Sequence, residues 1–301
     1  MRRVQPRHSL PYRRQAALFM TPYLLGTFVL VILPALATLA IAFTDYHAIE
    51  PPVWAGLDNF RRLAETPLVR MGLYNTLLFA MAAVPLRLLG ALGLALLLGG
   101  RRRGGGAVRT AVYLPTILPE AAYALVWLWI LNPLSGPLNL ILAAVGLPAP
   151  AWLAEAGTAR LAIIFMALLQ IGEGFIVLLA ARQNVPASLY EAAEVDGANR
   201  WQGFRHITLP LIVPWLLLLF CRDLVVAVQN TFTPSFILAY GGPYYATTFL
   251  PLLIYELSFD FADWGLASAV LVVVYAWILL LMWGVRNLIE GMRSRGTTED
   301  A

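Results

Sequence analysis

The chain has 301 residues, of which 60% are hydrophobic and only 13% are charged, and its formal net charge is +4. A soluble domain carries about 25% charged residues, so this composition excludes an ordinary soluble enzyme. Apolar runs longer than about 18 residues recur, which predicts a polytopic membrane protein. The lone cysteine, Cys221, excludes an internal disulfide and is expected to be a packed thiol.

Six apolar segments are long enough to cross a hydrocarbon core of about 30 Å as helices. They cover residues 18–43, 73–99, 111–131, 161–181, 207–229 and 266–285. The first is too long for the apolar region of a cleavable signal peptide, so we interpret it as a span. Backbone groups in lipid must bond within their own segment, so the predicted fold class is an all-α membrane protein with six transmembrane helices.

Two further apolar stretches, 138–153 and 243–257, are short and interrupted by proline. Their length favours re-entrant or interfacial helices over spans, and the sequence leaves these two alternatives open.

The placement of arginine orients the spans. With the N-terminus inside, the outer segments carry four arginines and the inner segments carry fifteen, namely Arg2, Arg3, Arg7, Arg13, Arg14, Arg101, Arg102, Arg103, Arg109, Arg182, Arg200, Arg205, Arg286, Arg293 and Arg295. This bias predicts that both termini are cytoplasmic. We therefore expect a cytoplasmic segment at 1–17, one transmembrane domain at 18–290 and a cytoplasmic tail at 291–301. Orientation and anionic lipid explain the basic runs, so no nucleic-acid partner is predicted.

The stretch 185–214 is polar between apolar neighbours and has the pattern of a helical hairpin on the inner side. Ser188 and Glu191 match a capping box that begins one short helix, and Gly197 stands where that helix ends. Asn199 and Gln202 have the spacing of a second capping box. The simplest interpretation of these residues alone is a polar loop that contains a local helical hairpin.

Five charged residues fall at membrane depth: Arg87, Glu120, Glu173, Arg222 and Asp223. Such residues are costly in a span and usually face the bundle or a wet cavity. Arg222 and Asp223 are adjacent, so they are not expected to pair with each other. An Arg222–Glu173 or an Arg87–Glu120 pair between helices is a hypothesis, and buried pairs that only fix the packing are the alternative.

Polar and aromatic residues near these charges are candidates for a translocation path. The candidates are Tyr123, Trp127, Gln170, Glu173, Gln229 and Asn230. For the two aromatic residues, packing or a place in the interfacial belt is the favoured alternative, because Trp and Tyr are enriched there anyway.

Motifs for catalysis are not found. The chain has no G-x-x-x-x-G-K-[ST] loop for nucleotide phosphates, and its three histidines are too scattered for a metal site. We therefore predict neither an enzyme nor a cofactor. An intramembrane enzyme that uses Glu173 and Asp223 would need a nucleophile or metal cluster that the sequence does not offer.

Several motifs resemble one family of membrane proteins. Glu191-Ala192-Ala193, followed after three residues by Asp196-Gly197-Ala198, resembles the EAA loop of binding-protein-dependent ABC importer permeases, here spanning 185–210. Other matches to this family are Gly56-Leu57-Asp58-Asn59-Phe60, Asn75-Thr76, Gly136-Pro137-Leu138-Asn139, Gly241-Gly242-Pro243 and Gly265-Leu266-Ala267-Ser268-Ala269. Together they cover nearly the whole chain and are similar to the sugar-type branch, which includes the maltose and glycerol-3-phosphate permeases.

The resemblance implies one transmembrane subunit of an ATP-driven importer in a bacterial or archaeal plasma membrane. It implies a second permease subunit, two ATPase subunits and an extracellular or periplasmic binding protein that delivers a sugar, polyol or sugar phosphate. The residues implied to couple the permease to the ATPase are Glu191, Ala192, Ala193, Asp196 and Gly197. The subunit of the maltose permease that holds the sugar has extra spans and a large extracellular insertion. This chain has neither, so those sugar contacts do not carry over. An importer of another solute such as an amino acid, or an ATP-independent carrier or channel, is the alternative.

Overall fold

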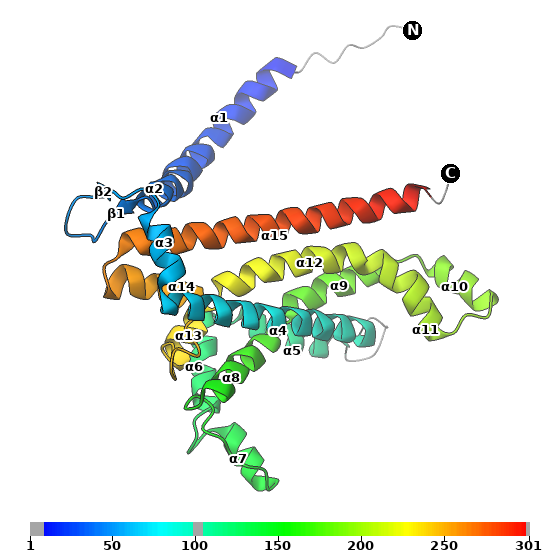
Figure 1. Ribbon diagram of the computed structural model, residues 1–301. Helices are drawn as coiled ribbons and strands as arrows, with labels where there is room; N and C mark the ends of the chain where they lie inside the picture. The colour runs from blue at the N-terminus through cyan, green and yellow to red at the C-terminus, as the bar shows by residue number, and fades with distance from the viewer. Residues whose placement is uncertain (1–8, 99–104, 299–301) are drawn as a thin grey trace. The chain divides into compact units, whose positions relative to one another are not determined.

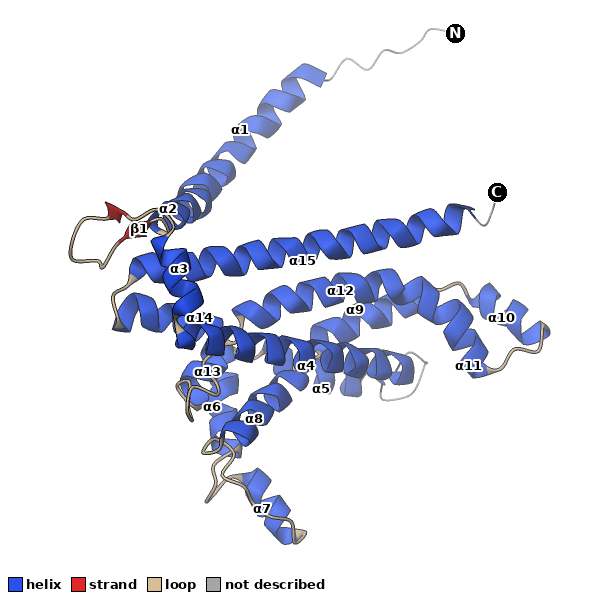
Figure 2. Ribbon diagram, viewed as in Figure 1, coloured by secondary structure: helices blue, strands red, loops and turns tan. Residues whose placement is uncertain are grey.

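The computed structural model describes residues 9–98 and 105–298, and its regular structure is helical apart from one pair of two-residue strands (Figures 1 and 2). The all-helical fold class is therefore confirmed for this part of the chain. Parts of the predicted segments 1–17 and 291–301, and the arginines at positions 2, 3, 7 and 101–103, lie outside it. The chain divides into two compact units, residues 1–65 with 257–273, and residues 66–256 with 274–301.

The first unit opens with one long apolar helix. It is built from α1 (Ser9–Thr27), the π-helical turn η1 (Phe28–Ile32) and α2 (Leu33–Ile41). In the apolar window of Ala16–Ile41 none of the residues is buried. An apolar helix that exposes its side chains all round is suited to contact with lipid or with another subunit.

A short connection follows this helix, and a single asparagine organises it. Strands β1 (Thr44–Asp45) and β2 (Val53–Trp54) pair antiparallel, and α3 (Asp58–Glu65) comes next. Buried Asn59 of α3 donates hydrogen bonds to the carbonyl oxygens of Ala42 and Thr44, at 3.1 and 2.8 Å. The asparagine of the G-L-x-N-F motif thus satisfies backbone groups where the first long helix ends.

The same unit includes the beginning of the last helix, α15 (Trp264–Thr298). Asp263 accepts a hydrogen bond from the Leu266 amide at 3.0 Å, which caps the start of α15, and its carboxylate also pairs with Arg62. The Trp264 amide donates to the Tyr46 carbonyl oxygen at 3.0 Å. These bonds join the two chain segments that form this unit.

The second unit contains the remaining helices. In chain order they are α4 (Pro67–Leu98), α5 (Gly105–Ile117), α6 (Glu120–Ile130), α7 (Pro137–Ala144), α8 (Ala156–Leu168), α9 (Gly172–Gln183), α10 (Ala187–Val195), α11 (Arg200–Gly203), the π-helical turn η2 (Phe204–Thr208), α12 (Leu209–Gln229), α13 (Phe232–Leu238) and α14 (Leu250–Tyr255). The π-helical turn η3 (Glu256–Asp260) follows α14 and belongs, from Leu257 on, to the first unit.

Helix α4 is the centre of the second unit. It packs against α8, α9, α12 and α14. Its buried face carries mostly small side chains, among them Ala80, Ala83, Ala91 and Ala95. Small residues let helix backbones approach closely, which is how helices pack where no hydrophobic effect drives them together. The core of the unit lies along this face of α4.

Four helices of the described chain are long and apolar enough to cross a membrane: Ala16–Ile41, Pro67–Leu98, Arg200–Leu238 and Trp264–Gly284. The number rises to six if two bent helix pairs each count as one span. The predicted single helix at 111–131 is wrong, because α5 and α6 are separate helices bent by 101°. Pro119 causes this break, since it is non-helical at φ −54° and ψ 135° and biases Leu118 away from helix.

The predicted helix at 161–181 is also interrupted. Helices α8 and α9 are bent by 42° across residues 169–171. The two short apolar stretches form helices of eight and six residues, α7 and α14. Both are too short to cross a bilayer, as their length indicated.

Candidate functional site: a polar pocket and a helical hairpin

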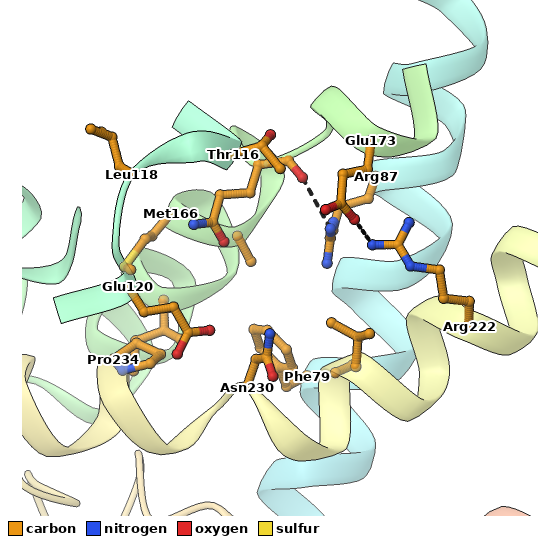
Figure 3. Close-up of a pocket in the computed structure, with 15 residues that line it drawn as sticks. Phe79, Arg87, Thr116, Leu118, Glu120, Met166, Glu173, Arg222, Asn230 and Pro234 are labelled. Atoms are coloured by element: carbon orange, nitrogen blue, oxygen red, sulfur yellow. Dashed lines mark hydrogen bonds and ion pairs between the residues drawn. The ribbon is translucent and has the colours of Figure 1, made fainter. Parts of the chain in front are cut away.

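A polar pocket of about 150 Å³ lies within the helices of the second unit (Figure 3). Among helices that are otherwise apolar, it gathers charged and amide side chains from α4, α6, α9 and α12 and from the residues that follow α8 and α12. The polar residues that line it are Arg87, Thr116, Glu120, Gln170, Glu173, Arg222 and Asn230. A concave site with a few convergent polar groups is the usual form of a small-molecule site.

The pocket contains the predicted ion pair between α9 and α12. Arg222 pairs with Glu173, and Figure 3 shows this contact at one side of the hollow. Arg222 also lies 3.9 Å from its neighbour Asp223, measured from Nη1 to Oδ1. The expectation that these two adjacent residues do not pair is therefore wrong, because the long arginine side chain brings its guanidinium group within 4 Å of the neighbouring carboxylate.

Arg87 does not pair with Glu120 as predicted. Its Nε lies 3.9 Å from Oδ2 of Asp223, and its Nη2 donates a hydrogen bond to the Gln170 carbonyl oxygen at 3.0 Å. Glu120 instead accepts a hydrogen bond from the Thr233 hydroxyl at 3.1 Å. The bend before α6 explains the difference, because Glu120 opens α6 and that helix packs against α13.

The structure separates the six predicted path residues into two groups. Gln170, Glu173 and Asn230 line the pocket, whereas Gln229, Tyr123 and Trp127 are not part of its lining. Gln229 is exposed elsewhere, at the end of α12.

The two aromatic residues of the second group are buried packing residues of α6. The Tyr123 hydroxyl donates a hydrogen bond to the Met166 carbonyl oxygen at 2.9 Å. Trp127 meets Phe165 edge to face. These contacts fasten α6 to α8 and match the packing alternative.

Thr116 and Phe79 are two of the lining residues that the sequence does not point to. Thr116 lies in the last turn of α5, and its hydroxyl is buried without a hydrogen-bond partner among the described residues. Phe79 is buried and borders the pocket from α4. For Thr116, the only signal in the sequence is a hydroxyl group within an apolar run. For Phe79 there is no signal, because a phenylalanine in a span is ordinary.

The helical hairpin forms from α10 and α11, which Figure 1 shows beyond the N-terminal end of α12. The predicted capping box of Ser188 and Glu191 does not form. Helix α10 begins earlier, with Pro186 at its N-cap and no side-chain cap, so Ser188 already lies in the first turn. Glu191 is then an exposed residue in the middle of the helix.

The end of α10 agrees with prediction. Gly197 has φ of +80°, which suits glycine, and its amide bonds to the Glu194 carbonyl oxygen at 3.1 Å. The Ala198 amide bonds to the Ala193 carbonyl oxygen at 2.8 Å, which completes a Schellman motif. The predicted capping box of Asn199 and Gln202 is present at the start of α11.

Polar contacts tie the hairpin region to the helices. The Tyr190 and Thr208 hydroxyls are 2.7 Å apart, which links α10 to η2. Arg182 of α9 donates hydrogen bonds to the Ala95 and Leu96 carbonyl oxygens at 3.1 and 2.8 Å, near the end of α4. A hollow of about 570 Å³ lies among these segments and includes Tyr190 in its lining.

The hairpin exposes several apolar side chains. Val195 is 88% exposed, Trp201 is 64% exposed and Leu189 is 42% exposed. Ala192 is also exposed, and Ala193 is partly exposed. Large exposed apolar side chains beside small ones are typical of a surface that binds a partner.

Comparisons with known proteins agree with these features. Residues 88–294 match the family described as binding-protein-dependent transport system inner membrane component. A probable ABC transporter permease protein, YesP, of Bacillus subtilis is 33% identical over 90% of this chain and 87% of its own length. The trehalose/maltose transport system permease protein MalF of Thermococcus litoralis is 30% identical over 90% of this chain and 92% of its own.

The fold matches a solved transporter as well. A chain in the crystal structure of a bacterial ABC transporter involved in the import of the acidic polysaccharide alginate superposes with a TM-score of 0.82. The two chains are 26% identical, and the match covers 92% of this chain and 96% of the other. The chain belongs to the family of binding-protein-dependent transport system inner membrane components, the permease subunits of ABC transporters.

Proposed function

We propose that this permease forms part of the membrane path of an ATP-driven importer for a sugar, such as an oligosaccharide or polyol. Relatives are named for the transport of trehalose and maltose, of starch degradation products and of sulfoquinovosyl glycerol. Permeases of this family are transmembrane components, and a separate subunit hydrolyses ATP. The proposed complex contains a second permease, two ATPase subunits and a binding protein outside the membrane.

The proposed topology has six spans in the inner membrane, with both bent helix pairs counted as spans. Both termini then lie in the cytoplasm, as the arginine bias predicts. The domain limits of 1–17, 18–290 and 291–301 follow this topology. The hairpin of α10 and α11 lies on the same side as the termini, where an ATPase can reach it.

The pocket is the proposed place where the sugar passes. Gln170 and Asn230 carry amides, and Glu173 carries carboxylate oxygens, all of them suited to hydrogen bonds with sugar hydroxyls. Charged residues within membrane helices commonly mark substrate paths. Tyr123 and Trp127 then act indirectly, because they hold α6 against α8.

The exposed apolar surface of the hairpin is the observation that carries the proposed coupling to an ATPase. Val195 and Trp201 offer anchors for a pocket on a partner, and the small Ala192 and Ala193 allow close approach. Asp196 and Gly197 end α10 in the Schellman motif and fix the direction of the turn. The exposed carboxylate of Glu191 is free to contact the ATPase, because it has no capping role.

The Tyr190–Thr208 bond is the proposed mechanical link in this coupling. It joins α10 to η2, which continues directly into α12, and α12 carries Arg222 at the pocket. A movement of the docked hairpin would therefore reach the pocket through one continuous helical segment. The bond lies outside the pocket, so its loss would uncouple the two sites without changing the pocket itself.

Purification of the complex through this chain in a gentle detergent tests the proposal. Mass spectrometry is expected to identify a P-loop ATPase and a second permease with the wild-type chain. Val195→Asp should lose the ATPase, because it places a charge in the apolar docking surface. Leu134→Asp is the matched control, since Leu134 is 90% exposed in the turn before α7, far along the chain from the hairpin.

Recovery of the chain alone, at good abundance and without an ATPase, would contradict the proposal. It would favour an ATP-independent carrier or channel. Transport of an amino acid, and of no saccharide, by the intact complex would instead contradict only the assignment to sugars.

A further inference from the structure

The carboxylates at the pocket outnumber the guanidinium groups. Glu120 and Glu173 line it together with Arg87 and Arg222, and a third carboxylate, Asp223, is not part of the lining but lies 3.9 Å from each arginine. From this arrangement we infer that the pocket admits uncharged saccharides and rejects acidic ones, such as uronates and sugar phosphates. The inference rests on the proposed function and narrows its substrate class.

Both guanidinium groups already have carboxylates within 4 Å, although the buried Arg87 Nε makes no hydrogen bond within the described residues. Arg222 pairs with Glu173 and lies 3.9 Å from Asp223. Arg87 lies 3.9 Å from Asp223 and donates to the Gln170 carbonyl oxygen at 3.0 Å. An acidic ligand would have to compete with the half-exposed Glu173 for Arg222, or displace the buried Asp223 and leave that carboxylate without its partner in a desolvated place.

Glu120 adds a charge that no arginine neutralises among the described residues. Its carboxylate accepts a hydrogen bond from the neutral hydroxyl of Thr233. In Figure 3 it lies across the hollow from the Glu173–Arg222 pair. A ligand in the hollow therefore faces a carboxylate on one side and an internally neutral pair on the other.

This arrangement favours hydroxyl groups over anions. Ionised carboxylates only accept hydrogen bonds, and each sugar hydroxyl can donate one. The Asn230 and Gln170 side-chain amides can both donate and accept, so a neutral sugar can satisfy all of these groups. A like charge placed against Glu120 is repelled, which is the usual way a site excludes a close analogue.

The test measures saccharide binding to the purified complex in lipid nanodiscs by saturation-transfer NMR. The probes are neutral disaccharides and the same disaccharides with the C6 hydroxymethyl group oxidised to a carboxylate. The complex is expected to bind at least one neutral probe, and to bind its carboxylate form at least roughly tenfold more weakly because of Coulomb repulsion in a partly buried site.

Two variants make the test independent of the unknown natural sugar. Glu173→Gln removes the main partner of Arg222 and should strengthen binding of the carboxylate probe severalfold. Glu120→Gln removes a negative charge that no arginine neutralises among the described residues. It should therefore reduce the difference in affinity between the neutral probe and the carboxylate probe. Glu155→Gln is the control, since Glu155 is exposed before α8 and is not part of the pocket lining, and it should leave the ratio unchanged.

Each outcome decides a separate point. Equal or tighter binding of the carboxylate probe by the wild-type complex would overturn the charge inference and leave the sugar proposal standing. The charge inference would also be overturned if the Glu173→Gln and Glu120→Gln complexes assemble and keep the wild-type ratio of affinities for the neutral and carboxylate probes. Failure of every saccharide to bind would overturn the proposed sugar path, and the inference with it.

Discussion

The backbone conformation of Gly197 directly determines how helix α10 ends. Its φ of +80° is disfavoured for any residue with a Cβ atom, and open space surrounds the position that a Cβ would occupy. Gly197→Ala is therefore expected to destabilise the end of α10 by about 1 kcal/mol through backbone strain alone. The ratio of sugar transported to ATP hydrolysed by the complex should fall, while the amount of protein in the membrane stays near normal.

Gly203 provides the matched control for this change. It lies in the helical region at φ −59°, and a Cβ there would meet its nearest neighbour, Cδ1 of Tyr190, at 3.9 Å. Gly203→Ala should preserve coupling, because alanine favours helix more than glycine does. Equal loss of coupling in both variants would show that the conformation of Gly197 is not what matters.

Arg87 and Asp223 form a buried pair of opposite charges, in which each residue offsets the charge of the other. Their side chains are 14% and 5% exposed. Asp223→Leu should lower the stability of the complex by about 3 kcal/mol, because it leaves a buried arginine without its neighbouring carboxylate charge. Thermal unfolding followed by intrinsic fluorescence in detergent measures the change.

The double variant Arg87→Met with Asp223→Leu tests whether the pair accounts for this loss. Replacing both charges with apolar groups of similar size is expected to recover most of the stability, since buried pairs contribute little net energy against such replacements. Additive losses in the double variant would mean that the two residues do not act as a pair.

At the scale of elements, the approach of α5 to α9 depends on one glycine. A Cβ at Gly172 would lie 2.9 Å from the Tyr113 Cα atom and also too close to Thr116. Gly172→Ala should therefore push these helices apart and cost about 1–3 kcal/mol. Gly93→Ala, where nothing lies within 4 Å, should be neutral or stabilising, and melting temperatures of the two complexes make the comparison.

The helix breaks show what can and cannot be read from apolar runs. The six runs were visible because a span must be long and apolar, whatever its shape. The break at Pro119 was hidden within one such run, although the proline itself was the signal. Continuous hydrophobicity outweighs a single proline in such a pattern, which is why the sequence predicts one helix at 111–131.

Charge pairing was harder to predict than helix ends. Local hydrogen bonds set the Gly197 turn and the Asn199 cap, so neighbouring residues were enough to find them. Pairing of Arg87 depends on how α4, α9 and α12 are rotated, and nearly uniform apolar helices do not encode that rotation in their pattern. The Arg222–Glu173 pair was one of two hypotheses, and only the folded arrangement distinguished them.

For the whole molecule, the proposed topology gives a direct expectation. Alkaline phosphatase, which needs disulfides, should be inactive when fused after Ala301 in the cytoplasm. The same enzyme inserted at the exposed Glu50, between β1 and β2, should be active, because the first span ends before it. The opposite result, an active phosphatase at the C-terminus and an inactive one at Glu50, would contradict the proposed orientation.

The π-helical turn η2 has a consequence for how related chains can change in length. A π-turn holds one residue more than an α-helical turn, and each α-helical residue turns the chain by about 100°. Loss of one residue within Phe204–Thr208 would convert η2 to α-helix and leave the faces of the flanking helices nearly unchanged. Loss of one residue between Leu209 and Phe220 would instead rotate Arg222 by about 100° relative to the hairpin. Among related chains, single-residue deletions should therefore be tolerated at η2 and selected against in α12.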